Sequence, residues 1–150
     1  MALLQIKLEG ESCLRRKSEQ IKKITKQLLK LGQDMLETMY EAKGVGLAGP
    51  QVGINKRIIV VDTGEGPFIL INPEIMQMEG RQKDVEGCLS IPGRNEYITR
   101  AASVIVSGLD LKGRTVKINA GGLLARAFQH EIDHLNGILF IDYLSEKTED

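Results

Sequence analysis

The only two histidines of the chain, His130 and His134, lie four residues apart. On a helix this spacing puts both side chains on one face, so the two imidazoles can bind the same metal ion. Glu131 follows the first histidine, and its carboxylate can reach a water molecule on that metal. The pattern His-Glu-x-x-His is typical of metal-dependent hydrolases. The alternative is a surface helix that carries two histidines by chance, and the pattern by itself leaves the metal and the substrate open.

A catalytic metal centre usually has three protein ligands and one open position for water. Since the chain has no third histidine, the remaining ligand must be a carboxylate or a cysteine. Cys88 is the stronger candidate, because the glycine before it lets the backbone approach a metal closely. The alternative for Cys88 is a small buried side chain that only packs.

Composition and charge exclude several classes of protein. The formal net charge of the 150 residues is zero, with 20 basic and 20 acidic side chains, which argues against a dedicated nucleic-acid binder. No apolar stretch approaches the roughly 18 residues of a membrane span, and no leader sequence is apparent. We therefore expect a cytoplasmic location, with Cys13 and Cys88 reduced. At this length a single domain over residues 1–150 is expected.

Two helices are expected to position the site. Apolar residues at helical spacing predict a helix from Gln20 to about Ala42, and the stripe comprises Ile21, Ile24, Leu28, Leu31, Met35 and Met39. A second helix, from about Gly122 to Asn136, carries the two histidines. Asn136 and the glycine that follows are a standard helix stop.

Short apolar stretches between turn residues indicate strands at residues 58–61, 68–71, 103–109 and 115–118. Asn72-Pro73 is expected to end the second strand, and residues 76–85 to be extended and half exposed. The segment Glu86–Gly93 should be bounded by turns, and Ile138–Ile141 should pack back on the molecule. Because most connections are too short for crossover helices, we expect an α+β fold, with mainly antiparallel strands around the central metal-binding helix.

The segment Gly44–Gly53 is rich in glycine and contains Pro50, which predicts backbone that is neither an ordinary strand nor an ordinary helix. A phosphate-binding loop is one interpretation, but no Lys-Ser or Lys-Thr pair follows it. A plain linker is another, but its apolar residues alternate in a way that linkers lack. The segment should therefore approach another group closely.

Three motifs, in this order, resemble those of peptide deformylases: Gly44–Gln51, Glu86–Ser90 and Gln129–His134. The resemblance extends over most of the chain and includes Asp34–Tyr40, Asn72-Pro73 and Asp142–Leu144. This family removes the formyl group from the N-terminal formyl-methionine of new bacterial and organellar proteins. The resemblance therefore implies a single catalytic domain of the deformylase fold that acts on N-formylmethionyl nascent peptides.

The resemblance also assigns roles at the metal. It implies that Cys88, His130 and His134 bind one divalent ion, with metal-bound water as nucleophile and Glu131 as general acid and base. The native metal of the family is typically Fe²⁺, and Zn²⁺, Ni²⁺ or Co²⁺ can occupy the site. The ligand set suits zinc and iron alike.

Further residues are implied to support the chemistry and the substrate. Gln51 and the backbone N–H of Leu89 would hold the formyl oxygen, and an ion pair of Glu86 with Arg100 would brace the Cys88 loop. Two unrelated surface charges are the alternative for that pair. A pocket for the methionine side chain would be lined by Val45, Gly46, Leu123, Ala127 and His130.

The chain departs from the family pattern at two positions and at its end. Asp84 lies where some relatives carry an apolar residue, and Gly49 replaces a common alanine, for which we expect a looser loop. The six polar residues after Leu144 cannot supply the C-terminal helix with which some relatives dock on the ribosome. We expect a monomer with at most transient ribosome proximity and no contact with membranes.

Two other functions fit parts of the pattern. A zinc endopeptidase would take a carboxylate as its third ligand and would not need Cys88 for metal binding. A non-catalytic metal-binding module would close the site with a fourth protein ligand. The presence of Gln51 and Glu131 argues against the module, because a structural metal needs neither.

Overall fold

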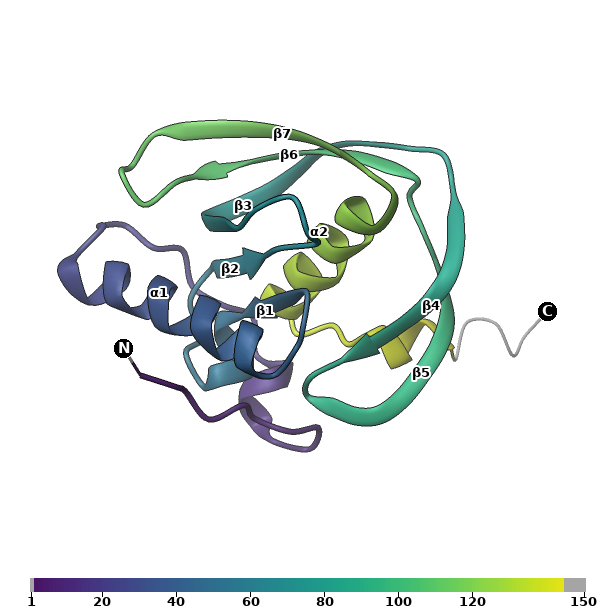
Figure 1. The fold of residues 1–150 in the computed structure, drawn as a ribbon, viewed down its shortest axis with the longest axis horizontal. Helices are drawn as coiled ribbons and strands as arrows, with labels where there is room; N and C mark the ends of the chain where they lie inside the picture. Colours follow the sequence, from purple (N-terminus) through teal and green to yellow (C-terminus); the bar gives the residue numbers. More distant parts are fainter. Residues whose placement is uncertain (1, 145–150) are drawn as a thin grey trace.

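A computed structural model describes residues 2–144 of the chain. Helix α1 (Lys26–Glu41) lies at one side of the molecule, and helix α2 (Gly122–Leu135) runs through its middle (Figure 1). Three short 3₁₀ helices complete the helical elements of this part: η1 (Ser12–Arg15), η2 (Gly49–Val52) and η3 (Phe140–Tyr143). The polar tail expected from Ser145 to Asp150 lies outside the described residues. No helix between residues 2 and 144 is long and apolar enough to cross a membrane.

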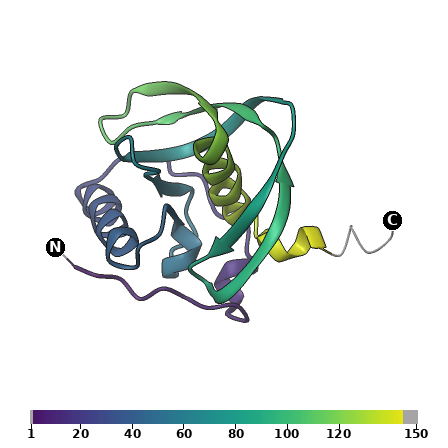
Figure 2. The ribbon, with the colours of Figure 1, turned by 45° about the vertical axis from the view of Figure 1, so that its right-hand side comes forward.

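The strands form two antiparallel sheets. A five-stranded sheet has the order β1-β2-β3-β6-β7, and a two-stranded sheet pairs β4 with β5. The strand bounds are Gly46–Ala48 (β1), Ile58–Val61 (β2), Phe68–Glu79 (β3), Gln82–Cys88 (β4), Ile91–Arg100 (β5), Ser103–Leu109 (β6) and Thr115–Gly121 (β7). Figure 2 shows α2 with strands from both sheets curving around it. The predicted α+β class, with antiparallel strands around a central helix, is confirmed.

Strand β2 explains how the core is divided, because it is buried on both faces. Ile59 and Val61 belong to the apolar cluster that includes α2, whereas Ile58 and Val60 belong to the cluster that includes α1. Successive side chains of a strand point to opposite faces, so a continuous apolar run is what a strand between two helices requires. The five-stranded sheet thus holds α2 against one face and α1 against the other.

The segment after α2 packs back on the two-stranded sheet, as the sequence predicted. Leu139 and Phe140 are buried with Ile91 and Ile98 of β5. The turn after the helix depends on Gly137, whose φ of +75° is in the left-handed region. A third apolar cluster therefore lies beside the histidine-bearing end of α2.

The predicted start of the first helix is wrong. Helix α1 begins at Lys26, and the Thr25 side chain caps it by accepting a hydrogen bond from the Leu28 N–H. Ile21 lies in extended chain, where its N–H and C=O bond the side-chain amide of Asn72. Ile21 and Ile24 still pack with the helix residues, so apolar spacing alone could not separate the two segments.

Asn72-Pro73 does not end a strand, contrary to the prediction. Strand β3 continues through it to Glu79, with a register shift between Ile71 and Glu74 where β3 pairs with β6. Such a bulge accommodates a proline, which has no N–H for the ladder. Asn72 has a φ of +52°, a conformation that asparagine adopts more readily than most residues.

Strand β5 was not predicted, and the prediction for the glycine-rich segment was wrong in part. Part of that segment is the short strand β1, which pairs with β2. The close approach expected there is found at Gly49, where a Cβ would lie 2.6 Å from the Ile54 carbonyl oxygen. Tight packing at Gly49 is the opposite of the looser loop that we expected.

Candidate metal centre

Three potential ligand atoms converge between α2 and the end of β4. His130 and His134 lie on the buried face of α2, with their Nε2 atoms 3.2 Å apart. The Sγ atom of Cys88, the last residue of β4, lies 3.4 Å from His134 Nε2. All three atoms lie within 4.8 Å of one another, and they are the one such group found among residues 2–144.

The separations of His134 Nε2 from His130 Nε2 and from Cys88 Sγ, 3.2 and 3.4 Å, fit the sharing of one metal ion. A tetrahedral metal with bonds of about 2.0–2.3 Å separates its ligand atoms by roughly 3.3–3.6 Å. Two imidazoles and a thiolate form a donor set suited to zinc or iron and leave one position open for water. The third ligand candidate is thus Cys88, because the ligand group contains no carboxylate.

Glu131 lies beside the ligand group in a buried position. Its Oε2 lies 4.0 Å from His130 Nε2, and its buried Oε1 has no hydrogen-bond partner within the described chain. Burial raises the pKa of Glu131 to about 7, although the His130 charge opposes the shift. A carboxyl group that exchanges a proton near neutral pH is suited to general acid–base chemistry.

The glycine-rich segment packs directly against this carboxylate. A Cβ at Gly46 in β1 would lie 2.4 Å from Glu131 Oε2. Gln51 is buried in η2, accepts a hydrogen bond from the Ala48 N–H, and directs its Nε2 toward Ser90 Oγ at 3.1 Å and Cys88 Sγ at 3.5 Å. The glycine-rich segment therefore places the Gln51 amide donor beside Cys88 and a residue without a side chain, Gly46, beside Glu131.

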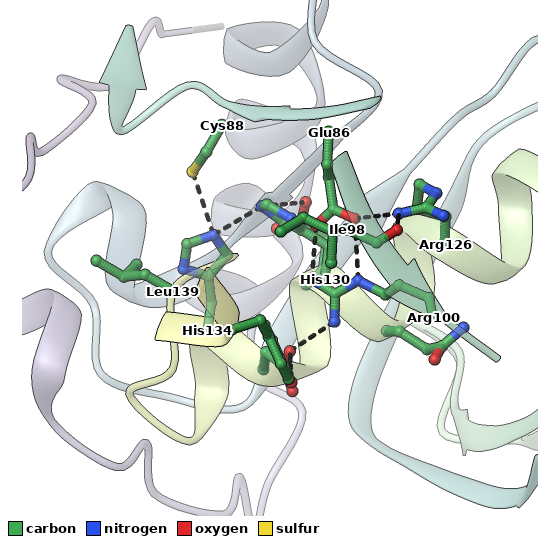
Figure 3. A network of polar contacts seen from close by, with 12 residues as sticks. Glu86, Cys88, Ile98, Arg100, Arg126, His130, His134 and Leu139 are labelled. Atoms are coloured by element: carbon green, nitrogen blue, oxygen red, sulfur yellow. Dashed lines mark hydrogen bonds and ion pairs between the residues drawn. The ribbon is translucent and has the colours of Figure 1, made fainter. Parts of the chain in front are cut away.

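Glu86 is the centre of a buried ion-pair network. Arg100 donates to both of its oxygens, at 3.0 and 2.5 Å, and Arg126 donates to Oε2 at 2.7 Å. Oε1 also lies 2.5 Å from His130 Nδ1, so Glu86 holds the ring whose Nε2 lies beside that of His134 (Figure 3). The side chains of Glu86 and Arg100 are 5% and 4% exposed, so they are not two unrelated surface charges.

The network sets the charge states of its members. Burial opposes the ionisation of Glu86, but hydrogen bonds from His130 and Arg100 outweigh it and hold its pKa far below the usual range. Burial also disfavours the charged form of His130, but Cys88, Glu131 and Glu86 raise its pKa to about 10. Burial lowers the pKa of His134 well below its usual value. A histidine binds a metal as the neutral base, so metal binding competes with protonation of His130.

A cavity of about 420 Å³ opens onto the ligand group. Ten of the twelve residues proposed from the sequence line it: Val45, Gly46, Gln51, Glu86, Cys88, Leu89, Leu123, Ala127, His130 and Glu131. The other two, His134 and Arg100, are not part of its lining. Asp84 is exposed, and its neighbour Val85 lines the cavity. The departure at Asp84 therefore leaves the apolar character of the wall intact.

Two charged residues of the site, Arg126 and Asp133, were not predicted from the sequence. Arg126 lies one helical turn before His130, is 3% exposed, and also donates to the carbonyl oxygen of Ile98. Asp133 lies between the two histidines in the sequence and accepts a hydrogen bond from Arg100 at 2.7 Å. The signal that could have identified Arg126 is its place inside the apolar run of α2, since a buried charge requires a partner.

A buried His-Glu-x-x-His helix, a cysteine from a neighbouring strand and an adjoining cavity define a metal-dependent hydrolase. The chain matches the polypeptide deformylase family over residues 3–150. It therefore belongs to the polypeptide deformylase family.

Individual relatives agree with this assignment. The chain is 58% identical to the peptide deformylase of Halothermothrix orenii, over 95% of this chain and 94% of that protein. It is 54% identical to peptide deformylase 1 of Clostridium acetobutylicum, over 97% of each chain. The crystal structure of the Thermotoga maritima enzyme superposes with a TM-score of 0.93, at 41% identity and over 95% of this chain and 97% of that one. The Ehrlichia chaffeensis enzyme, in complex with actinonin, gives 0.95 at 42% identity and covers all of this chain and 93% of its own.

Proposed function

We propose that the enzyme removes the formyl group from the N-terminal formyl-methionine of newly synthesised polypeptides. Water and the formamide bond give formate and a free amino terminus. The observation that carries the proposal is the cavity lined by Cys88, His130 and Glu131, with His134 completing the ligand group beside it. Family membership supports this reaction over other amide hydrolyses.

Cys88, His130 and His134 would hold one divalent ion, for which we propose Fe²⁺ as the native metal. When bound, such an ion acidifies a water molecule and polarises the formyl oxygen. Glu86 fixes His130 through Nδ1, which leaves Nε2 as the ligand atom. Arg100 and Arg126 keep Glu86 ionised, so the support of the ring does not depend on pH in the neutral range.

Glu131 is proposed to move the proton. It takes a proton from the attacking water as the C–O bond forms, and it gives that proton to the amine nitrogen as the C–N bond breaks. Its raised pKa suits both steps, because the same group must be a base first and an acid afterwards. The absence of a Cβ at Gly46 leaves the carboxylate room beside the substrate.

The negative charge that develops on the formyl oxygen requires donors. We assign this role to the Gln51 amide and to the backbone N–H of Leu89. Gln51 is suited to it because its Oε1 is held by the Ala48 N–H, which directs its Nε2 toward Cys88. Loss of one such donor should reduce turnover by about 10²–10³-fold.

The methionine side chain is proposed to occupy the apolar wall of the cavity. Val45, Leu123 and Ala127 line this wall together with Gly46 and His130. Val45 and Leu123 are 43% and 54% exposed, so a substrate would cover apolar surface that is open to solvent in the free enzyme.

The two alternative functions have less support. An endopeptidase with a carboxylate ligand is disfavoured because Cys88 completes the ligand group, whereas Glu86 bonds the far nitrogen of His130. A closed structural site is disfavoured because the group adjoins an open cavity and contains three ligands within residues 2–144.

The test is formate release from formyl-Met-Ala-Ser by anaerobically purified enzyme, with the metal content measured on the same sample. Wild type is compared with Glu131→Ala and Cys88→Ala. We expect formate from wild type alone, with about one metal ion retained by Glu131→Ala and lost from Cys88→Ala. A fully metallated wild type that releases no formate would overturn the proposal, and an unformylated peptide would then test the endopeptidase alternative.

A further inference from the structure

The ion-pair network of Glu86 continues beyond Arg100 to the last described turn of the chain. Asp133 Oδ2 accepts hydrogen bonds from Arg100 Nη1 and from the Tyr143 hydroxyl, each at 2.7 Å. Tyr143 belongs to η3, whereas Asp133 belongs to α2 and Arg100 to β5. Strand β5, helix α2 and the turn that follows this helix thus meet at one carboxylate oxygen.

Arg100 is held from several directions. One edge of its guanidinium bonds Glu86, Nη1 bonds Asp133, and its central carbon lies 5.1 Å from the centre of the Tyr143 ring. A guanidinium is planar and its donors are fixed in direction, so these contacts determine the orientation of the group. That orientation in turn places Glu86 Oε1 against His130 Nδ1.

Tyr143 is itself firmly placed. Asp142, its neighbour in η3, pairs with Arg15 at 2.6 Å and accepts a hydrogen bond from the Leu139 N–H at 3.0 Å. Leu139 and Phe140 are buried against β5, and the Phe140 ring centre lies 6.0 Å from that of His130. Burial and the bond to Asp133 raise the pKa of Tyr143 to about 12, so the hydroxyl keeps the proton that it donates.

We propose that Tyr143 is a positioning residue of the metal centre, acting on His130 through Asp133, Arg100 and Glu86. Each link is a charge-assisted hydrogen bond among buried or half-buried groups, where such bonds are strong. The inference rests on the proposed metal centre. It adds Tyr143, in the turn that follows α2, to the supporting residues Glu86 in β4 and Arg100 in β5.

The test uses cobalt-loaded enzyme and compares wild type, Tyr143→Phe, Asp133→Asn and the double variant. Tyr143→Phe keeps the ring over Arg100 and removes only the hydroxyl. The readouts are the absorption of the thiolate-bound cobalt and the rate of cobalt release to excess chelator. The matched control is Tyr40→Phe, which removes another tyrosine–aspartate hydrogen bond, to Asp62, and neither residue bonds a member of the Glu86 network.

We expect Tyr143→Phe to shift the cobalt spectrum and to speed metal release by about two- to ten-fold, less than the 10–100-fold typical when a direct partner of a ligand is lost. Tyr40→Phe should match wild type in both readouts. The double variant should release cobalt more slowly than the product of the two single effects predicts, because both substitutions break the same chain of bonds.

The proposal is overturned if Tyr143→Phe lowers the melting temperature but leaves the spectrum and the release rate at wild-type values, since Tyr143 would then serve stability alone. The proposal would also be contradicted if cobalt release from the double variant were accelerated by the full product of the two single-variant factors. A wild-type protein that binds no cobalt would overturn the metal centre and this proposal together, which separates that failure from a failure of Tyr143 alone.

Discussion

At the scale of single residues, the site depends on what surrounds each functional group. Glu131 and Glu86 are both buried glutamates near His130, yet their pKa values shift in opposite directions. Hydrogen bonds from His130 and Arg100 outweigh the effect of burial on Glu86 and stabilise its charge. Glu131 has one buried oxygen without a partner among residues 2–144, so burial dominates and favours its protonated form. The two carboxylates are thereby suited to different tasks, one to a fixed charge and the other to proton transfer.

The raised pKa of Glu131 predicts the acid limb of the pH profile. Glu131 must be ionised to take a proton from water, so turnover should fall as pH decreases through its pKa. That value is about 7 without a metal, and a bound cation favours the carboxylate, so the limb should lie at or below about pH 7. The measurement is kcat/KM for formate release as a function of pH. Glu131→Gln should lose about 10²–10⁴-fold in rate, and its residual activity should lack this limb.

The absence of a side chain at Gly46 predicts a second effect on rate. In Gly46→Ala the new Cβ would lie 2.4 Å from Glu131 Oε2, so the carboxylate must move. A displacement of about 1 Å at a catalytic group can reduce kcat about 100-fold. Gly121→Ala is the control, since its Cβ would meet its nearest neighbour at 3.9 Å. Equal kcat values for the two variants would show that Glu131 is not confined by β1.

At the scale of elements, α2 owes its role to its burial on nearly all sides. Its buried residues include Arg126, Gln129, His130, Glu131 and His134, so one helix provides both core packing and site chemistry. The Gln129 amide bonds the backbone of Ala101 through both its oxygen and its nitrogen, each at 3.0 Å. These bonds fix the helix against the end of β5, where Arg100 begins the ion-pair network.

The capped start of α1 predicts a stability effect at Thr25. Thr25→Ala removes the acceptor for the Leu28 N–H and should lower the free energy of unfolding by about 1 kcal/mol. Thr25→Ser keeps the hydroxyl and should stay close to wild type. Urea unfolding followed by circular dichroism measures both. If Thr25→Ala is as stable as wild type, the helix does not depend on this cap.

At the scale of the whole molecule, the Glu86 network joins the two-stranded sheet, α2 and η3. Its donors come from β5 and α2, and Asp133 extends it to η3. Removal of one partner from a buried ion pair costs about 3–5 kcal/mol, because the remaining charges stay buried. Glu86→Gln should therefore destabilise the protein as well as weaken metal binding.

The sign of the pH dependence follows from the lowered pKa of Glu86. Its folded pKa lies far below the usual 4.5, so its stabilising effect is present above about pH 4.5 and is lost as pH falls. The stability difference between wild type and Glu86→Gln should be largest near neutral pH and should shrink in acid. Urea unfolding of both metal-free proteins at several pH values tests this. A difference that stays constant into acid would show that the charge of Glu86 is not responsible.

Features that depend on local spacing could be predicted from the sequence alone. The two histidines with their neighbouring glutamate, the buried strand Ile58–Val61, the hairpin of β6 with β7 and the stop of α2 at Asn136 are visible from periodicity and turn residues. The order of the three motifs indicated the family, which the comparisons confirmed. The roles of the individual site residues and the single domain over residues 1–150 stay predictions.

Features that depend on partners distant in the chain became visible only in the folded molecule. The extended path of Ile21 is stabilised by the side chain of Asn72, and strand β5 is stabilised by pairing with β4. The burial of Arg126 and Asp133 beside Glu86 follows from how α2 packs against the two-stranded sheet. Local propensity cannot supply such contacts, because the free energy that fixes them comes from groups brought together by folding.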